Sequence, residues 1–417
     1  MLKGIVIENY RSCLSTKLNL HPSLSVLIGP NSSGKTNLLQ AIMLLSKLAS
    51  EEPEHYVKPA PPTGAPSRIR AVFEIPSLQV QLKASLALLT DESNNDKLLG
   101  SRQKWTFKRR RKKYKSEMPL SLAIGMDPRL SPTAPAFHMS PQYYRIYRSQ
   151  LSFRGFRSEL PKEVARGFVE ISRFCRGFRY YSASQFTNPA NCPTSFQIER
   201  DEGRGTFARF RGHTKILYDM YIAQKVQQDK AYEQFLQIVG PKGLRLIDAL
   251  TFGEVQASST EYSVRVGGKV EPRKRENRLI IPQFKIGRQI LSPNQLSEGT
   301  FKTLALLFHL FRKDSRALLI EEPEVCVHHG LLASILEIIK TASEEKQIVL
   351  STHSDYVLDH VKPENVFSIS FDKGSGTIAR QIRETMNAKE FAALRLYLET
   401  EGNLGEYWRE GGFGDRP

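Results

Sequence analysis

The chain has 417 residues, enough for roughly two or three domains, and its 40% hydrophobic and 25% charged residues are ordinary for a globular protein. The formal net charge of +17 is unusually positive and favours nucleic acid or an acidic protein surface as a partner. The four cysteines form no C-x-x-C pair, which disfavours a structural zinc site, and no stretch approaches the roughly 18 uncharged apolar residues of a membrane span. We therefore expect a reduced, cytoplasmic protein that makes no membrane contact.

The N-terminal segment predicts a strand, a glycine-rich loop and a helix in succession. Residues 1–28 read as a β-hairpin followed by a short buried strand at 24–28, and a helix is expected from Asn37 to Leu48. Between them, residues 29–36 read GPNSSGKT and match the phosphate-loop pattern G-x-x-x-x-G-K-[ST]. The backbone N–H groups of such a loop point at one anion, and the helix N-terminus that follows favours negative charge. This context favours a bound nucleoside triphosphate over a chance glycine turn.

Side chains of the loop have expected roles in holding ATP and Mg²⁺. Lys35 would reach the β and γ phosphates, and the hydroxyl of Thr36 would ligate Mg²⁺. The residues expected to contact the nucleotide here are Gly29, Asn31, Ser32, Ser33, Gly34, Lys35, Thr36 and Asn37.

A basic, strand-rich segment follows at about 66–125, and its strand-like runs predict antiparallel strands beside the nucleotide site. Within it, residues 104–115 place basic side chains around three aromatic ones. As a hairpin, this stretch would follow a phosphate backbone, with an affinity that falls as salt rises. The candidates for nucleic-acid contact are Lys104, Lys108, Arg109, Arg110, Arg111, Lys112, Lys113 and Lys115. A solvated charged face and a site for an acidic protein partner are the two alternatives.

The middle of the chain predicts an insertion. Residues 160–176 read as a helix, and residues 178–185 read as a strand that ends at Gln185. The pattern then changes to a helical stretch at 214–239 followed by polar, strand-like pieces. The expected organisation is a discontinuous ATPase domain at 1–185 and 290–417 with an insertion lobe at 186–289.

Paired carboxylates in the second half of the chain are candidate catalytic groups. The stretch that begins at Arg316 is apolar from 317 to 320 and is followed directly by Glu321 and Glu322. Hydrolysis of a triphosphate needs one carboxylate that holds Mg²⁺ and another that orients and polarises the attacking water. Glu321 suits the first role and Glu322 the second.

Two further segments are candidates for phosphate contact. Leu296–Thr300 opens an apolar helix, where Ser297 and Gly299 either offer donors to a phosphate or form an ordinary helix cap. Residues 346–352 read as another strand, which is followed by His353; taken alone, this residue is more often a satisfied histidine at a strand end, and only the order of the motifs favours phosphate contact.

The fixed order of these motifs resembles that of the ABC-type ATPase domain, in the branch that contains RecF, SMC proteins and the OLD-family nucleases. The segments that carry the resemblance are Asn9–Ser12, Gly29–Thr36, Leu296–Thr300, Ile320–Glu324 and Ser351–Ser354. The resemblance implies an α/β fold, namely a P-loop NTPase of ABC ATPase type with an antiparallel β subdomain and a mixed insertion lobe. It also adds Arg11 to the residues that contact the nucleotide. The chain departs from many relatives by reading LSEGT for LSGGQ and by having Glu321 in place of Asp.

The resemblance also implies individual roles and a dimer. Gln185 would sense Mg²⁺ and the attacking water, with Gln197 as the alternative, and His353 would contact the γ-phosphate in cis. Ser297 and Gly299 would contact the γ-phosphate of the nucleotide bound by a second subunit. The expected assembly is a head-to-tail dimer or a higher homo-oligomer that ATP closes and hydrolysis opens.

The C-terminal segments at 402–408 and 411–414 resemble the tails of stand-alone bacterial ATPases that accompany a nuclease or toxin in antiphage defence. This resemblance implies a sensor or regulator that works with nucleic acid, DNA or RNA, and with a separately encoded effector. Too few residues follow His353 for the Toprim domain of OLD nucleases, so no nuclease domain is expected. A RecF-like repair ATPase and a slow-turnover scaffold that holds an effector inactive are the alternatives, and a transporter ATPase is the least favoured.

Overall fold

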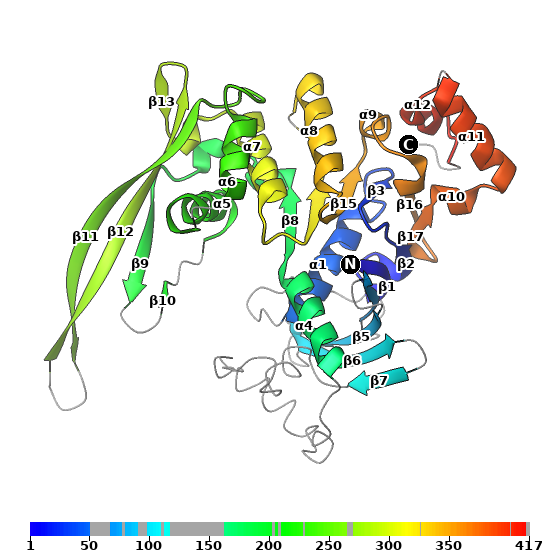
Figure 1. Ribbon diagram of the computed structural model, residues 1–417, viewed down its shortest axis with the longest axis horizontal. Helices are drawn as coiled ribbons and strands as arrows, with labels where there is room; N and C mark the ends of the chain where they lie inside the picture. Colours follow the sequence, from blue (N-terminus) through cyan, green and yellow to red (C-terminus); the bar gives the residue numbers. More distant parts are fainter. Residues whose placement is uncertain are drawn as a thin grey trace, which may run out of the picture. The chain divides into compact units, whose positions relative to one another are not determined.

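The computed structural model describes residues 1–50, 67–76, 80–90, 98–109, 112–116, 162–201, 205–206, 210–227, 230–264, 270–325, 327–400 and 402–413. The chain divides into two compact units (Figure 1). The first unit comprises Met1–Tyr180, Asp314–Glu322 and Ile339–Pro417, and the second comprises Tyr181–Lys313 and Pro323–Ile338. Each unit is thus assembled from separate stretches of the chain. Across the described residues, no helix combines the length and the apolar character needed to cross a membrane.

An antiparallel sheet in the first unit has the strand order β2-β1-β4-β5-β6-β7. Its strands are β1 (Leu2–Tyr10), β2 (Cys13–Asn19), β4 (Arg68–Ile75), β5 (Val80–Thr90), β6 (Leu98–Arg109) and β7 (Lys112–Ser116). Burial alternates along β4, so Ile69, Ala71 and Phe73 face the core while their neighbours face outward, as the two-residue period of a strand dictates. The expected N-terminal hairpin is confirmed, and the expected strand at 120–124 lies outside the described residues.

The second sheet of this unit has the order β17-β16-β3-β15-β14-β8. Its strands are β3 (Leu24–Ile28), β8 (Phe178–Ser182), β14 (Ala317–Glu321), β15 (Gln347–Thr352), β16 (Val366–Asp372) and β17 (Gly376–Gln381). Strands β16, β3, β15 and β14 run parallel, and every residue of β3, β14 and β15 is buried. Their near-continuous apolar sequences are typical of parallel strands that are covered on both faces.

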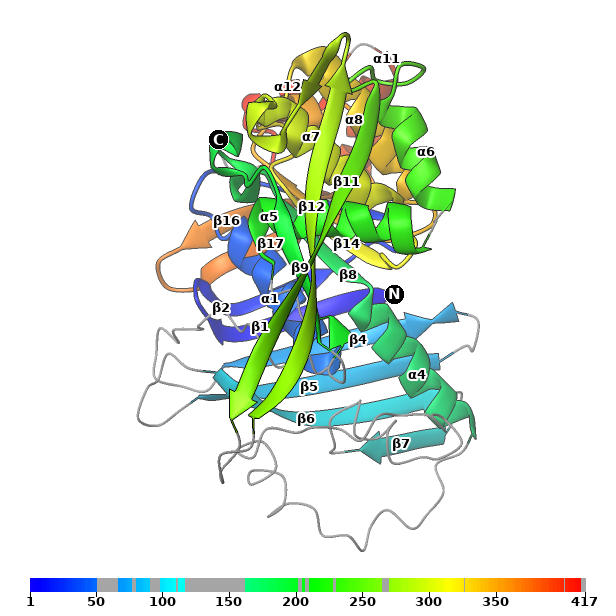
Figure 2. The same cartoon turned by 90° about the vertical axis from the view of Figure 1, so that its left-hand side faces the viewer.

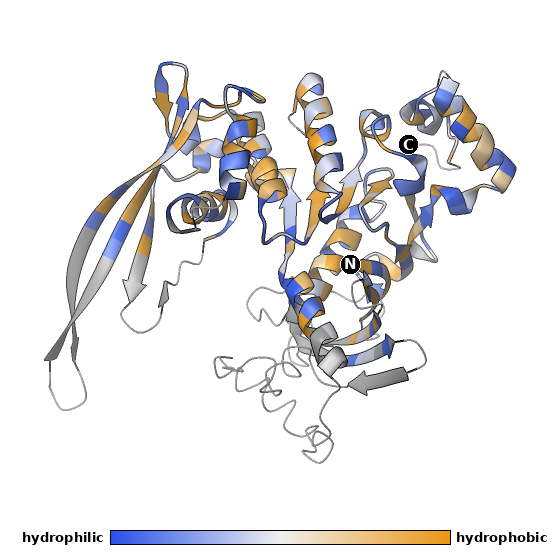
Figure 3. Ribbon diagram, viewed as in Figure 1, coloured by the Kyte–Doolittle hydropathy of each residue, from blue (hydrophilic) through white to orange (hydrophobic). Residues whose placement is uncertain are grey.

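Helix α1 (Lys35–Ser50) joins the two sheets, since it packs against β1 of the first and against β14 and β15 of the second (Figure 1). Its inward residues Leu38, Ile42 and Leu45 recur at helical spacing and are fully buried. Helix α4 (Lys162–Arg176) packs against α1 and β4. In Figure 3, α1 and the strands beside it are largely coloured as hydrophobic, which marks the core that positions the loop before α1.

Short helices complete the first unit at its C-terminal end. They are α9 (Asp355–Leu358), α10 (Ile382–Thr385), α11 (Ala388–Thr400) and α12 (Leu404–Arg409). Helix α12 packs on α9, where the backbone N–H of Gly405 donates to Asp359 Oδ1 at 2.7 Å. Trp408 is buried, so this helix is tied to the unit by both a hydrogen bond and apolar contact. Helix α8 (His329–Ala342) begins in the second unit and ends in the first.

The second unit has its own antiparallel sheet, with the order β10-β9-β12-β11 and β13 paired to β12. Figure 2 shows its two long strands, β11 and β12, side by side. Its strands are β9 (Phe196–Asp201), β10 (Gly205–Thr206), β11 (Ala249–Val264), β12 (Val270–Ile286) and β13 (Gln289–Leu291). The helical stretch expected at 214–239 is α5 (Gly212–Tyr221), a π-helical segment (Ile222–Gln227) and α6 (Lys230–Val239). Helix α7 (Glu298–Phe311) packs on α6 through edge-to-face contacts of Phe308 with Phe235 and Tyr232.

One expected element is shorter than the sequence predicted. The strand expected to reach Gln185 ends at Ser182, and Gln185 lies in the 3-10 helix Ala183–Phe186 that follows. The 3-10 turn brings the buried ring of Phe186 onto that of Tyr181, a stacking contact between residues that an extended strand would keep apart.

Candidate nucleotide-binding site

The phosphate loop connects the end of β3 at Ile28 to the start of α1 at Lys35. Ser32 and Gly34 have φ angles of 64° and 103°, in the left-handed region that glycine adopts most readily. A Cβ atom at Gly34 would overlap the Thr377 hydroxyl, and one at Gly29 would overlap the backbone carbonyl of Ile369. The curled backbone is therefore enforced by close neighbours on β16 and β17, and both loop glycines are needed for it.

Lys35 is held over this loop. Its ammonium group donates to the carbonyl oxygens of Gly29 at 2.7 Å and Pro30 at 2.9 Å. The side chain of Lys35 is only 6% exposed, so its charge is largely removed from bulk solvent. A buried, hydrogen-bonded ammonium at the mouth of a glycine loop is suited to a phosphate group.

Glu321, the last residue of β14, is fixed by two hydroxyl groups from different elements. The Thr36 hydroxyl in the first turn of α1 donates to its Oε1, and the Tyr180 hydroxyl on β8 donates to its Oε2. Glu321 is 8% exposed, so few other orientations are open to its carboxylate. The structure thus brings together Thr36 and Glu321, two of the three residues expected at a metal ion, but not the third, Gln185, and it adds Tyr180, which the sequence gave no reason to select.

Glu322 follows directly and has an unusual backbone. Its φ is 50°, and a left-handed conformation of a non-glycine residue costs roughly 1–3 kcal/mol unless the surroundings enforce it. Its backbone N–H donates to the carbonyl of Ser351 at 2.9 Å, which fixes the turn. The side-chain Oε1 lies 3.8 Å from Nδ1 of His353, the residue after β15. Both side chains are partly exposed, so water can reach the space beside them.

The turn between β1 and β2 supports α1 through hydrogen bonds. Arg11 has φ 50°, and its Nη1 donates to Asn37 Oδ1 at 3.2 Å and also to Gln40 Oε1. Asn37 Nδ2 in turn donates to Ser12 Oγ at 2.7 Å. Arg11 and Asn37 were both among the residues expected to contact the nucleotide, and in this structure they are hydrogen-bonded to each other.

Thr377 is a second residue that sequence reasoning missed. Its hydroxyl lies within donating distance of Ser12 Oγ at 2.7 Å and of the Ser33 carbonyl at 3.1 Å. Its backbone N–H donates to the Ser12 carbonyl at 2.8 Å. Because Thr377 lies at the start of β17, far along the chain from the loop, only the folded sheet brings it there.

The residues present fit a complex of Mg²⁺ with a nucleoside triphosphate. Within the described part of the chain, two buried hydroxyls at the site have no hydrogen-bond partner, Ser33 Oγ in the loop and Ser351 Oγ on β15. Such an atom costs about 1–3 kcal/mol unless a partner reaches it. Mg²⁺ is usually held by one or two protein oxygens together with substrate phosphates. The adjacent oxygen donors of Thr36 and Glu321 match this pattern.

The other residues expected at the site lie in the second unit. Ser297 is the N-cap of α7, and its Oγ accepts from the Thr300 backbone N–H at 3.2 Å. The structure therefore shows the helix cap, which was one of the two interpretations of the segment Leu296–Thr300. Gly299 lies in the first turn of α7, and Gln185 and its alternative Gln197 are both exposed.

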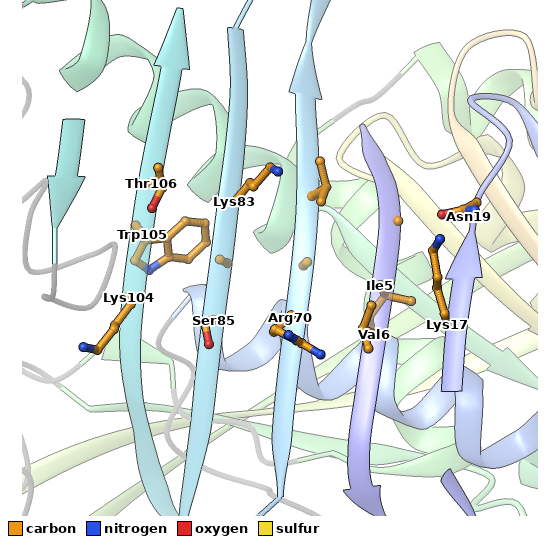
Figure 4. Close-up of a pocket in the computed structure, with 14 residues that line it drawn as sticks. Ile5, Val6, Lys17, Asn19, Arg70, Lys83, Ser85, Lys104, Trp105 and Thr106 are labelled. Atoms are coloured by element: carbon orange, nitrogen blue, oxygen red, sulfur yellow. The ribbon is translucent and has the colours of Figure 1, made fainter. Parts of the chain in front are cut away.

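The outer face of the antiparallel sheet carries a basic depression of about 650 Å³ (Figure 4). Its cations are Lys17 on β2, Arg70 on β4, Lys83 on β5 and Lys104 on β6. Strand register places three of them, Lys17, Arg70 and Lys104, in one row across the sheet, with one residue of the intervening strand between neighbours. Arg70 forms an ion pair with Glu8.

The segment predicted to contact nucleic acid is a hairpin formed by β6 and β7, in which Arg109 pairs with Lys112. Lys104 and Lys108 are exposed, and Lys113 and Lys115 lie on β7. Arg110 and Arg111 lie outside the described residues. Trp105, one of the three aromatics, faces the core and stacks on Phe73 with ring centroids 6.0 Å apart.

Two family models match the sequence. One described as an AAA ATPase domain matches residues 1–117, and one described as "AAA domain, putative AbiEii toxin, Type IV TA system" matches residues 246–359. The first covers the phosphate loop, and the second covers the segments that contain Ser297, Glu321 and His353.

The chain is also similar to curated RecF proteins, each described as a DNA replication and repair protein. It is 41% identical over 54 residues to that of Lactococcus lactis subsp. lactis (strain IL1403), covering 13% of this chain and 15% of the relative. It is 31% identical over 86 residues to that of L. lactis subsp. cremoris (strain MG1363), covering 21% and 24%. The matched segments thus span less than a quarter of these relatives.

Among solved structures, the chain is similar to an SMC head bound to the C-terminal winged-helix domain of ScpA, with 10% identity, a TM-score of 0.48 and coverage of 92% of this chain and 98% of that one. It is similar to the SMC head domain from Thermotoga maritima with 13% identity, a TM-score of 0.41 and coverage of 91% and 98%.

The matched models, the strand order and the loop geometry define the class of the protein. It has an α/β fold with a phosphate loop of the P-loop NTPase type, two segments that match AAA ATPase models, and local similarity to RecF.

Proposed function

We propose that this protein binds ATP with Mg²⁺ at the loop Gly29–Thr36 and hydrolyses it to ADP and phosphate. The observation that carries the proposal is the hydrogen bond from Thr36 to Glu321, with Glu322 beside it, because it joins the phosphate loop to the paired carboxylates. These are the groups that phosphoryl transfer to water requires.

Each residue of the nucleotide site has a separate role in binding ATP or in its hydrolysis. Lys35 and the loop N–H groups bind the β and γ phosphates, and Thr36 and Glu321 hold Mg²⁺, which supplies charge neutralisation when it is bound. Glu322 orients a water molecule and accepts its proton as the oxygen attacks the γ-phosphorus. The bond from that phosphorus to the bridging oxygen breaks, and ADP leaves. His353, whose Nδ1 lies 3.8 Å from Oε1 of Glu322, donates to a γ-phosphate oxygen.

A single substitution tests this assignment. Glu322→Gln removes the proton acceptor but keeps the shape of the side chain, so ATP affinity should stay within about threefold while turnover falls about 100-fold or more. Glu344→Gln, at an exposed carboxylate, is the matched control. Normal turnover in Glu322→Gln would exclude its role as base. No binding of a non-hydrolysable ATP analogue by the wild-type protein in Mg²⁺ would exclude the function as a whole.

The second part of the proposal is a head-to-tail homodimer in which α7 of each subunit completes the site of the other. Gly299 and Glu298 lie in the first turn of α7, where backbone N–H groups have no partner within the helix, and Gly299 has no side chain to block approach. Ser297 Oγ accepts from the Thr300 backbone N–H and also lies 2.7 Å from Thr300 Oγ1, so two hydroxyl groups stand together at this end of the helix.

Analytical ultracentrifugation of the Glu322→Gln protein tests the dimer. ATP should shift the protein from monomer to dimer, and adding Ser297→Arg should block the shift but leave ATP binding to the monomer intact. Glu344→Arg, at an exposed turn, should not affect dimerisation. A protein that stays monomeric when saturated with ATP would contradict this arrangement.

The third part of the proposal is that nucleic acid contacts the basic depression. Lys17, Lys83 and Lys104 supply cations, and Ser85 and Thr106 supply hydroxyls (Figure 4). Neighbouring strands lie about 4.8 Å apart. Measured across the sheet, Arg70 on β4 is therefore about 10 Å from Lys17 on β2 and about 10 Å from Lys104 on β6. The large aromatic side chain of the lining, Trp105, faces the core, so the face is suited to phosphate contact with little base stacking.

Fluorescence anisotropy with a labelled duplex tests this contact. Lys83→Glu with Lys104→Glu should weaken binding about tenfold or more and flatten its dependence on salt, whereas Lys389→Glu on the exposed face of α11 should not. Equal binding of polyglutamate and duplex would instead indicate an acidic protein partner. Unchanged duplex affinity in the double variant would remove this face from the function.

The cellular role that we propose is regulation of a separately encoded effector in antiphage defence. It is supported by the description of the model matched at 246–359, which refers to a toxin–antitoxin system. The RecF matches support the alternative of a DNA-repair ATPase. Affinity capture followed by mass spectrometry and nucleic-acid analysis distinguishes them, because a nuclease or toxin supports defence and replication proteins support repair. Steady-state ATPase rates with and without nucleic acid separate both roles from a slow-turnover scaffold.

A further inference from the structure

Glu321 has a feature that the proposed hydrolysis does not explain. Each oxygen of its carboxylate accepts a hydrogen bond, Oε1 from Thr36 and Oε2 from Tyr180. Thr36 is already assigned to the metal ion, whereas Tyr180 belongs to neither the phosphate loop nor any segment that resembles a known motif. The contacts that surround Tyr180 therefore indicate its role.

The Tyr180 ring is anchored, so its hydroxyl has a defined position. The ring is half-buried and packs against the hydrophobic core of the first unit. The start of β8 is fixed to the start of β14, because the Gly177 carbonyl accepts from the backbone N–H of Arg316 at 2.7 Å. The two strands that carry Tyr180 and Glu321 are therefore held at one register.

A glutamate needs such a partner more than an aspartate would. It has one more rotatable bond, and rotation about its terminal bond is broad. A carboxylate has about four lone-pair positions, and the two hydroxyls occupy two of them. The remaining two are left for a metal ion or its water ligands.

We infer that Tyr180 is a positioning residue that holds the Glu321 carboxylate in the orientation that binds Mg²⁺. This inference rests on the proposed nucleotide site and goes beyond it, because it assigns the metal geometry to a residue that itself touches neither metal nor nucleotide. A tyrosine hydroxyl that simply takes the nearest acceptor is the plain alternative, and the two make different predictions for metal binding.

Tyr180→Phe removes only the hydroxyl and keeps the packed ring. With a non-hydrolysable ATP analogue bound, the dissociation constant of Mn²⁺, measured by electron paramagnetic resonance, should rise about tenfold, the range expected when the partner of a metal ligand is lost. The Mg²⁺ concentration that gives half-maximal turnover should rise by the same factor. Affinity for the analogue in EDTA should stay within about twofold, because the phosphate loop is untouched.

A double-mutant cycle and a matched control complete the test. In a Glu321→Asp background the shorter side chain no longer reaches the phenol, so Tyr180→Phe should then change Mn²⁺ affinity less than twofold. Tyr397→Phe is the control, because that phenol also donates to a carboxylate, Glu406, at 3.4 Å on α11 and α12. It should leave metal affinity unchanged.

The outcomes are distinct. Unchanged Mn²⁺ affinity in Tyr180→Phe, an equal effect in Tyr397→Phe, or a full effect in the Glu321→Asp background would each overturn the positioning role while leaving the ATPase assignment in place. A wild-type protein with no metal-dependent binding of the analogue would overturn both.

Discussion

The hydroxyl of Thr36 donates to the carboxylate of Glu321, although the two residues lie 285 positions apart in the chain. Thr36 is in the first turn of α1, and Glu321 is the last residue of β14. The bond is possible because β15 lies between β3 and β14 in the parallel sheet, with Leu27 paired to Ser351 and Ser351 paired to Glu321. The sheet thereby aligns the ends of all three strands beside the phosphate loop.

The first prediction concerns that hydroxyl. Thr36→Val keeps the volume of the side chain but removes its oxygen, so ATP turnover in Mg²⁺ should fall about 100-fold through loss of a metal ligand. Thr36→Ser keeps the oxygen and should stay within about threefold of the wild-type rate. Steady-state phosphate release measures both, and similar rates in the two variants would argue against metal ligation by Thr36.

Gly34 should tolerate no side chain. Its φ is 103°, and a Cβ atom would overlap the Thr377 hydroxyl. Gly34→Ala should therefore abolish binding of a fluorescent ATP analogue, with the far-ultraviolet circular dichroism retained. Gly287→Ala is a useful comparison, because that glycine also has positive φ, 59°, but no described atom within 4 Å of the added Cβ. It should bind the analogue normally, and normal binding by Gly34→Ala as well would contradict this account of the loop.

Thr377 should affect the nucleotide site from β17. Thr377→Val keeps the shape and removes the hydroxyl that reaches Ser12 Oγ and the Ser33 carbonyl. Loss of a hydrogen bond of about 1 kcal/mol on the loop should weaken ATP affinity about fivefold. Isothermal titration calorimetry measures this, with Thr385→Val as control, since the Thr385 hydroxyl at the end of α10 donates to the Ile382 carbonyl of the same helix. Equal affinities in all three proteins would show that the loop holds its shape without Thr377.

The two faces of β6 should differ in their sensitivity to mutation. Trp105 is 1% exposed and stacks on Phe73, so Trp105→Ala should lower the free energy of unfolding by about 3–5 kcal/mol. Its neighbour Lys104 faces solvent, and Lys104→Ala should change the free energy by less than about 0.5 kcal/mol. Urea denaturation measures both values. A small effect at Trp105 would contradict the inward orientation on which the phosphate-contact proposal depends.

Three cysteines should be unreactive in the native protein. Burial raises the pKa of Cys13 above its ordinary value and raises the pKa of Cys175 and Cys192 to about 12. Because the thiolate is the reactive form, labelling at pH 8 should be at least about 100-fold slower than in denaturant. Ellman's reagent measures this in a Cys326→Ser background, which removes a thiol outside the described residues. The contribution of Cys175 and Cys192 to the free energy of unfolding is fully present below pH 9 and is lost as the pH rises toward 12, because in this range the thiols ionise in the unfolded protein but not in the folded one.

The sequence predicted the elements around the phosphate loop because their signals are local. A short apolar run, a glycine loop and a helical period are contiguous in residues 24–48, and so are the strand and carboxylates that end at Glu322. The α/β fold with a P-loop was predicted from such segments and is confirmed. The assignment of roles to Gln185, Ser297 and Gly299 has no such local basis and stays a prediction.

Other features had no local signal. Tyr180 and Thr377 reach the site only because the sheet places β8 and β17 at its two edges, and neither stands in a recognisable motif. Strands β11 and β12 were predicted only as short pieces, yet they have 16 and 17 residues. Sequences such as EPRKREN in β12 carry no apolar alternation, because a hairpin strand can be held by cross-strand pairing alone with polar residues on both faces.

The position of β3 in its sheet has a consequence for biosynthesis. Both neighbours of this strand, β15 and β16, are translated long after it, and the backbone of Leu2 likewise waits for the side chain of Gln347, 345 positions later. Until the ribosome has delivered those partners, the nascent chain carries an apolar strand with two open edges. Emerging polypeptides that stop short of Gln347 should therefore associate with chaperones or aggregate, and the phosphate loop should become competent only after β15 and β16 have been translated.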